Sequence, residues 1–271
     1  MMRLFTPRAI LKGILPRALR LRLRRLVRPA LYEGDFRSWR DAQVASAGYD
    51  HPAITRKVTE AALAVREGRA MWERDTVLFH TPEPNEPLLR SLRHVARAHA
   101  GRLHVLDFGG ALGSTWWQHH FFLTEVTDVS WTVVEQPALV EIGRKEFTRG
   151  PVRFCHSIRE CWGSESPNAV LLSAVLPYLK EPHALLESIR AYSPDFILID
   201  RTGMTNRGRD LLTVQRVPPS IYEASYPCWF FDRRRLLDPL LSEYTLCDEW
   251  ITGDDVDIDA HHCGMLLKRC R

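Results

Sequence analysis

The stretch L-H-V-L-D-F-G-G-A-L-G at residues 103–113 decides the fold of this 271-residue chain. Its first five residues form a short apolar run that ends in Asp107, and a glycine-rich turn follows directly. Such a turn lets a ligand approach the backbone closely, because glycine has no side chain. The helix expected after the turn offers unpaired N–H groups in its first turn. The sequence therefore predicts a strand, a ligand-binding loop and a helix in this order.

Further short apolar runs alternate with helical segments after this stretch. This rhythm is typical of βαβ units with a parallel sheet that is buried on both faces. Two later runs, 244–248 and 264–268, flank a polar loop and suit an antiparallel pair that closes the sheet. We therefore expect an α/β fold with one mostly parallel, seven-stranded sheet. The other predicted strands are 131–135, 152–155, 169–173 and 196–200.

The part of the chain before this sheet has a different pattern. Apolar residues recur at helical spacing in residues 54–72 and again in 88–96, with W-E-R-D-T-V-L-F (72–79) between them. We expect residues 33–100 to form a helical cap over the cleft. The predicted organisation is thus a basic amphipathic arm (1–32), this cap and a ligand-binding domain (101–271).

The composition is that of an ordinary globular protein, with 45% apolar and 26% charged residues. It excludes a disordered chain, and no apolar run reaches the ~18 residues of a membrane-spanning helix. The six cysteines include no C-x-x-C pair. A reduced, cytoplasmic setting is therefore expected rather than a disulfide framework.

Charge is distributed unevenly along the chain, whose net charge is +4. Residues 1–32 contain nine Arg or Lys and no acid, whereas the remainder has 28 basic and 33 acidic residues. Nucleic-acid binding by the chain as a whole is thereby disfavoured. The leucine stripe and the arginines of residues 1–30 predict peripheral contact with an anionic membrane, at the inner face; a solvated tail is the alternative.

The detail of the glycine-rich turn selects the ligand. A dinucleotide-binding G-x-G-x-x-G motif would need glycine at the position of Phe108, and no G-K-S/T sequence follows that would make a P-loop. An acid two residues before the first glycine is instead the S-adenosylmethionine arrangement D/E-x-G-x-G-x-G, with Ala111 at the middle glycine. The residues expected to bind this cofactor are Asp107, Gly109, Gly110 and Gly113.

The ends of the next three strands add candidates for the same ligand. Glu135, followed by Gln136, ends the second strand, where an acid can accept both ribose hydroxyls. Ser157 follows the third strand, near the expected adenine, and Ser173 ends the fourth. Each of these side chains could instead only end a strand or cap a helix. Asp107 and Glu135 on successive strands favour the cofactor.

The chain also resembles a family of S-adenosylmethionine-dependent methyltransferases that recurs among bacterial surface-polysaccharide biosynthesis genes. The resemblance spans Tyr32 to Arg269 and implies a class I methyltransferase fold with S-adenosylmethionine as cofactor. It does not identify the acceptor. It rests on Y-E-G-D-F-R-S-W (32–39), W-E-R-D-T-V-L-F, D-F-G-G-A-L-G, V-V-E-Q-P (133–137), L-L-S-A-V-L-P-Y-L (171–179), I-D-R-T (199–202) and L-T-V-Q-R-V-P-P-S-I-Y-E-A-S-Y-P-C-W-F-F (212–231).

Candidates for the acceptor site follow the fifth strand. Arg201 has a guanidinium suited to a carboxylate, a phosphate or paired hydroxyls. Tyr222 and Tyr226 would project from one face if their aromatic, proline-rich segment is helical, and could then stack on a sugar. Burial in the core is the alternative. Asp75 and His156 are the candidate general bases.

We expect no metal site, since His119–His120 cannot share a helix face and the consecutive residues His261, His262 and Cys263 rarely ligate one ion. The predicted function is S-adenosylmethionine-dependent O-methylation of a small-molecule acceptor, a sugar or a glycan. A non-catalytic S-adenosylmethionine-binding or scaffold protein in polysaccharide assembly is the alternative. A nicotinamide-dependent reductase is disfavoured by Phe108.

Overall fold

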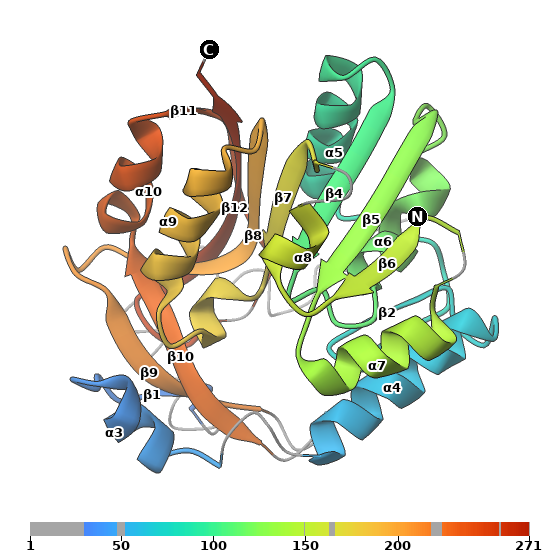
Figure 1. Ribbon diagram of the computed structural model, residues 1–271. Coiled ribbons are helices and arrows are strands. Elements are labelled where there is room, and N and C mark those ends of the chain that lie inside the picture. The colour runs from blue at the N-terminus through green and yellow to red at the C-terminus, as the bar shows by residue number, and fades with distance from the viewer. Residues whose placement is uncertain are drawn as a thin grey trace, which may run out of the picture.

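A twisted β-sheet with helices on both faces forms the body of the molecule (Figure 1). It is seen in a computed structural model, in which residues 30–47, 52–148, 150–162, 166–217, 224–254 and 256–270 are described. The sheet strands are β1 (Tyr32–Glu33), β4 (Arg102–Phe108), β5 (Asp128–Val134), β6 (Val152–Cys155), β7 (Ala169–Ser173), β8 (Phe196–Thr205), β9 (Leu211–Arg216), β10 (Ser225–Asp232), β11 (Tyr244–Ile251) and β12 (Ala260–Arg269).

Five strands form the parallel centre of the sheet, in the spatial order β6-β5-β4-β7-β8. Beyond β8, β12 and β11 follow as an antiparallel pair. All seven strands predicted from the sequence are present, and the α/β, Rossmann-like class is confirmed. The chain builds outward in one direction from β4 and then returns to β7 on its other side. This reversal is a topological switch point, where open α/β sheets bind ligands.

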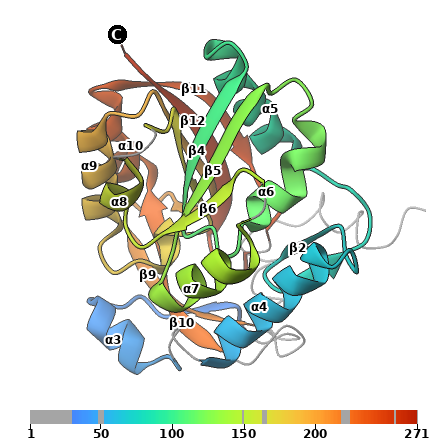
Figure 2. The ribbon, with the colours of Figure 1, turned by 45° about the vertical axis from the view of Figure 1, so that its right-hand side comes forward.

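The helices cover two separate faces of this sheet. One face carries α4 (Pro52–Arg66), α5 (Glu86–Ala98), α6 (Ser114–His119) and α7 (Pro137–Glu146), with α4 beside α7 in Figure 2. The other carries α8 (Ile158–Trp162), α9 (Pro182–Tyr192) and α10 (Arg233–Leu241).

Alternation along the central strands explains the two layers. Phe196 and Leu198 of β8 belong to the core under α5, whereas Ile197 and Ile199 belong to the core under α9 and α10. Successive side chains of a strand point to opposite faces, so a strand covered on both faces must be apolar throughout. None of the described helices has the length and apolar character needed to cross a membrane.

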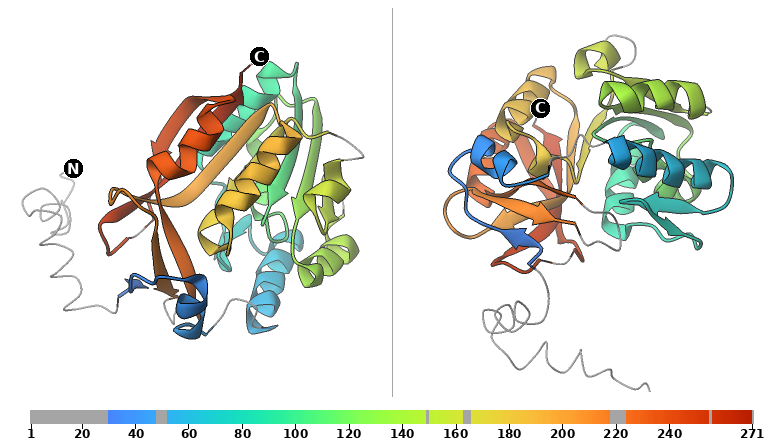
Figure 3. Two further views of the ribbon diagram at one scale, coloured as in Figure 1. Left: turned by 60° about the vertical axis from the view of Figure 1, so that its left-hand side comes forward. Right: turned by 90° about the horizontal axis from the view of Figure 1, so that it is seen from below.

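The prediction of a mostly parallel, seven-stranded sheet was wrong in extent, because the sheet has ten strands and is mixed. β10 pairs with the end of β8, β9 pairs with β10, and β1 pairs with β9. Figure 3 shows β1 and the short helix α3 (Trp39–Val44) beside β9 and β10. Strand β1 thus extends a second, antiparallel region of the sheet, which β9 and β10 form from the run 212–231.

Residues 33–100 are also not wholly helical. The W-E-R-D-T-V-L-F motif forms a hairpin of β2 (Trp72–Arg74) and β3 (Val77–Phe79). Its two-residue turn has positive φ at both Asp75 and Thr76, as a type I′ hairpin requires. The hairpin lies against α6 and so reaches the glycine-rich turn.

Strand β8 is shared by both sheet regions, and it contains a bulge at the point where they meet. Met265 pairs with Ile199 and Cys263 with Thr202, so that Gly264 alone faces both Asp200 and Arg201. Arg201 has a φ of 49°, in the left-handed region. A bulge bends a strand and redirects its side chains. Here it brings Asp200 and Arg201 to one cleft.

Candidate functional site

A cleft of about 330 Å³ lies at the switch point between β4 and β7. A second cavity of about 390 Å³ adjoins it, and both are bordered by Asn85, Arg201 and Asp254. Six of the predicted site residues line the cleft: Asp75, Gly109, Gly110, Ser173, Arg201 and Tyr226. The predicted cofactor residues Asp107, Gly113, Glu135, Gln136 and Ser157 are not part of its lining.

The glycine-rich turn is shaped by two different constraints. Gly109 and Gly113 have φ values of 73° and 87°, which residues with a side chain rarely adopt. Gly110 is required for space, since a Cβ atom there would overlap the carboxylate of Asp107. The backbone of the turn is therefore exposed to the cleft with a carboxylate directly behind it.

Asp107 is buried at the end of β4. Its Oδ2 accepts a hydrogen bond from Nε1 of Trp131 at 3.0 Å, while Oδ1 has no partner within the described residues. Burial raises the pKa of Asp107 to about 7. An unpaired buried oxygen is costly, so this carboxylate is suited to a ligand that brings a donor or a positive charge.

Glu135 holds the turn from the neighbouring strand. Its Oε1 accepts from the backbone N–H of Ala111 at 3.1 Å, and its Oε2 from that of Gln136 at 2.7 Å. Burial raises the pKa of Glu135. A carboxylate has about four acceptor positions, so these two bonds leave capacity for ribose hydroxyls. Ser157 lies further away and caps α8, where it accepts from the N–H of Glu160 at 3.2 Å.

A second buried carboxylate, which was not among the predicted site residues, lies within β8, at the bulge. Asp200 accepts from Nδ2 of Asn85 and Oγ of Ser173, each at 3.2 Å, and from Nε1 of Trp250 at 3.1 Å. Burial raises its pKa. Trp250 can reach it because Gly264 has no side chain, and a Cβ there would overlap the indole ring. The sequence signal was present, since Asp200 ends a predicted strand.

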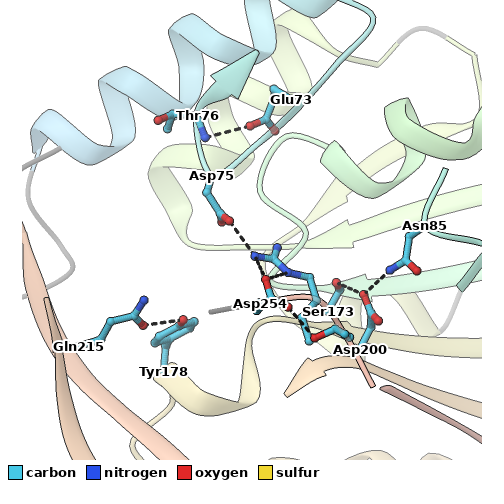
Figure 4. Close-up of polar contacts among 11 residues, drawn as sticks. Glu73, Asp75, Thr76, Asn85, Ser173, Tyr178, Asp200, Gln215 and Asp254 are labelled. Carbon is cyan, nitrogen blue, oxygen red and sulfur yellow. Dashed lines mark hydrogen bonds and ion pairs between the residues drawn. The ribbon is translucent and has the colours of Figure 1, made fainter. Parts of the chain in front are cut away.

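Arg201 is held between two acids at the mouth of the cleft (Figure 4). Its Nη2 lies 2.8 Å from Asp75 Oδ2, and its Nε donates to Asp254 Oδ1 at 3.3 Å. Burial alone would lower the pKa of Arg201, but the charges of Asp75 and Asp254 outweigh it and raise the pKa. Arg201 thus lines the cleft already paired with two carboxylates, and its contact with the acceptor stays a prediction. Asp75, predicted in a helical cap, lies in the turn of the β2–β3 hairpin.

Glu73 is another carboxylate of the cleft that the sequence analysis did not predict as a site residue. It is buried on β2, accepts from the hydroxyl of Ser114 and from the N–H of Thr76, and thereby ties the hairpin to the start of α6. Burial raises its pKa. Glu73 belongs to the W-E-R-D-T-V-L-F motif, but the prediction of a helix for this segment did not place its side chain at the cleft.

Aromatic side chains form the opposite wall of the cleft. The rings of Tyr178 and Tyr226 meet edge to face at 5.2 Å, and the Tyr178 hydroxyl donates to Oε1 of Gln215 at 2.8 Å. Tyr226 lies on strand β10, so the helical placement of this residue was wrong. Tyr222 lies outside the described residues.

The remaining predicted candidates lie elsewhere. His156 is on the surface beside Glu141 and Arg144, at 3.6 Å and 3.4 Å, and does not line the cleft. In the described part of the chain, no group of three or more His, Cys, Asp or Glu residues could hold a metal ion.

Comparison with family models and with curated proteins finds no match. Solved structures of methyltransferases are similar at low identity. The N-terminal domain of EvdMO1, solved with SAH and D-fucose, is 18% identical, with 82% of this chain and 98% of that chain covered and a TM-score of 0.47.

Two N-methyltransferases give comparable values. The 1,6-didemethyltoxoflavin-N1-methyltransferase of Burkholderia thailandensis, with 1,6-didemethyltoxoflavin and S-adenosylhomocysteine bound, is 18% identical over 83% of this chain and 95% of its own, at a TM-score of 0.43. NodS of Bradyrhizobium japonicum WM9, in complex with S-adenosylhomocysteine, is 11% identical over 80% of this chain and 100% of its own, at 0.44. At such scores the functional conclusion depends on the geometry of the cleft itself.

Proposed function

We propose that this protein is an S-adenosylmethionine-dependent methyltransferase of class I. One observation carries the proposal: Asp107 lies directly behind Gly110, with one buried carboxylate oxygen unpartnered within the described residues. Glu135 ends the adjacent strand and binds the same turn through Ala111. These two acids flank a backbone that is open to the cleft.

The charges of the cleft favour this cofactor over a dinucleotide. Glu73 and Asp200 are buried acids that line the cleft, and their carboxylates accept hydrogen bonds from uncharged donors. A pyrophosphate placed among these groups would meet like charges. A sulfonium and an ammonium group would instead find carboxylates nearby. The residues present therefore fit S-adenosylmethionine.

The mechanism requires mainly binding and orientation from this chain. When bound, S-adenosylmethionine supplies an electrophilic methyl group on a positively charged sulfur. Asp107 and the Gly109–Gly110 backbone would hold its amino-acid end, and Glu135, with Gln136 and Ser157 beyond it, its nucleoside end. Ser173 and Asp200 line the cleft and would border the position between cofactor and acceptor. Placing an acceptor oxygen in line with the methyl group supplies much of the rate enhancement.

The finer proposal is O-methylation of a sugar or another glycan-related small molecule. Its support is the wall of Tyr178 and Tyr226, which offers ring surfaces beside the polar amide of Gln215. Sugars combine apolar C–H faces with hydroxyl groups, and this wall presents both kinds of partner. The resemblance to a family from surface-polysaccharide genes points the same way.

Calorimetry and a transfer assay test the function in sequence. The purified protein should bind S-adenosylmethionine and not NAD; NAD binding alone would overturn the proposal. With tritium-labelled S-adenosylmethionine and a panel of neutral hexoses and their methyl glycosides, we expect label in the sugar and stoichiometric S-adenosylhomocysteine. Binding without turnover on any acceptor would favour the alternative, a non-catalytic S-adenosylmethionine-binding or scaffold protein in polysaccharide assembly.

We further propose that residues 1–30 attach the protein to anionic membrane at the cytoplasmic face; residues 1–29 lie outside the described part of the chain. This proposal is supported by the nine basic residues of the arm, since each Lys or Arg near an anionic membrane surface is attracted to it by about 1 kcal/mol. Deleting residues 1–30 should release the protein from anionic liposomes and leave cofactor affinity unchanged. Equal liposome binding by the deletion variant would contradict the proposal.

A further inference from the structure

His262 is the histidine that lines the cleft within the described part of the chain. It lies on β12 opposite Gly203, two residues from Gly264, which faces the bulge of β8. Its side chain is packed between the rings of Tyr32 and Phe230, at 6.3 Å and 5.6 Å, and is only 6% exposed. It lines the same cleft as the aromatic wall of Tyr178 and Tyr226, and the charges of Arg201 and Asp254 act on it.

The Nδ1 atom of His262 is buried and has no hydrogen-bond partner among the described residues. His119 shows what a structural histidine looks like in the same molecule. It is also buried, but its Nδ1 lies 2.8 Å from the carbonyl of Thr115 and its Nε2 accepts from the N–H of Asn85 at 3.1 Å. Since leaving a buried polar atom unpaired is costly, the difference sets His262 apart from a histidine whose two ring nitrogens are bonded within the fold.

The surroundings keep this imidazole neutral. Burial lowers the pKa of His262 to about 4, and the positive charge of Arg201 on β8 and His261 on its own strand act in the same direction. Asp254, from the β11–β12 connection, acts against them. Tyr32 of β1 is the other titratable group in contact, and its own pKa is raised by burial. A neutral imidazole can accept a proton, whereas an imidazolium cannot.

The other candidate bases are already engaged. The carboxylate of Asp75 is paired with Arg201, and that of Asp200 accepts three hydrogen bonds. His156 lies outside the cleft. An acceptor hydroxyl at the aromatic wall would therefore have His262 as its uncommitted basic neighbour.

We propose that His262 contacts the acceptor and takes the proton of the hydroxyl group that is methylated, an inference that rests on the proposed function. In this step the acceptor oxygen forms a bond to the methyl carbon while the bond from sulfur to that carbon breaks. The electron pair of the broken bond stays on sulfur, so that the sulfonium becomes a neutral thioether. The hydroxyl proton moves to the imidazole and then to solvent. Asp254 would stabilise the imidazolium.

The test compares His262→Gln and His262→Ala with His156→Gln as a matched surface control. With the most reactive sugar of the panel, we expect kcat to fall by about 100-fold in both His262 variants, within the range of general-base catalysis. S-adenosylmethionine affinity should change by less than about twofold, because the cofactor residues lie elsewhere. Added imidazole should restore part of the turnover of His262→Ala, which a purely structural role would not allow.

Three outcomes would overturn the inference. One is a His262→Gln enzyme with near-normal kcat, and another is a fall in turnover that only follows loss of folded protein. The third is an imidazolium at His262 at neutral pH. It would be detected by nitrogen NMR of the cofactor-loaded enzyme, which needs no acceptor. If the wild type binds no S-adenosylmethionine, the proposed function itself fails, so the two failures are distinguishable.

Discussion

The two halves of the cleft are built in different ways. The half assigned to the cofactor comes mainly from one continuous stretch, Asp107 to Gln136, with Ser157 beyond it, and its contacts are largely to backbone groups. The half assigned to the acceptor is assembled from side chains far apart in sequence, such as the pairing of Arg201 with Asp75. The first half can be recognised in a short motif, whereas the second exists only after the chain has folded.

The largest effect is expected from Asp107, the buried acid in the half of the cleft assigned to the cofactor. Because the pKa of Asp107 is raised to about 7, the folded state retains its proton to higher pH than the unfolded chain. The cofactor-free protein should therefore be most stable below about pH 4 at this site and lose stability towards about pH 7, by roughly 1.4 kcal/mol for each unit between the two pKa values.

Urea unfolding across this pH range would measure the effect. Asp107→Asn keeps an oxygen that can accept from Trp131 and removes the ionisation, so its stability should vary less with pH than that of the wild type. Parallel curves for the two proteins would contradict the raised pKa.

Gly110→Val should abolish cofactor binding, with at least about a 100-fold loss of affinity and the sheet intact by circular dichroism. The new side chain would overlap Asp107 and also cover the backbone that the cofactor approaches. Gly253→Ala is the matched control, since a Cβ there has open space and no positive φ. If Gly110→Val binds S-adenosylmethionine normally, the turn is not the cofactor site.

For the second half, Arg201→Ala and Tyr226→Phe should lower turnover about tenfold, or about 1.4 kcal/mol in the activation barrier. S-adenosylmethionine affinity should remain nearly unchanged, because neither residue contacts the glycine-rich turn. Arg90→Ala removes an exposed ion pair with Asp248 and serves as the control. A fall in turnover that only follows loss of folded protein would instead make these residues part of the core.

The smallest effect is expected for Asp75→Asn, as measured by chemical denaturation. The Asp75 side chain is 56% exposed, so breaking its pair with Arg201 should cost less than about 1 kcal/mol in unfolding free energy. Asp254→Asn should cost more, since the Asp254 side chain is 24% exposed. The reverse order would mean that the hairpin turn, and not the β11–β12 connection, anchors Arg201.

The sequence predicted the parallel half of the fold because its signals are local. Each predicted apolar run falls on a strand of the structure, and Asp107 and Glu135 lie at the ends of neighbouring strands. Asp200 follows the same sequence pattern. Its role was missed because the residues that donate hydrogen bonds to it, Asn85 and Trp250, come from distant segments.

The half of the cleft assigned to the acceptor could not be predicted, because the local sequence patterns of its strands are misleading. The run that forms β10 contains Pro227 and consecutive aromatic residues, which suggested a loop or a helix. Pro227 is tolerated because β10 pairs with β8 only at Phe231 and Asp232, which leaves one flank of the strand without a full ladder. The hairpin turn Asp75–Thr76 lacks the Asn-Gly or Asp-Gly signal of its type.

The bulge on β8 also limits how this protein can change length. Deleting either Asp200 or Arg201 would restore regular pairing with β12 and would remove one of the two side chains that the bulge brings to the cleft. Thr202 to Thr205 all pair with β12, and the last two also pair with β10, so these residues would keep their partners and their faces. A one-residue deletion here should therefore leave the sheet paired but damage the cleft, so that the spacing of this strand matters to the site as well as the identity of its residues.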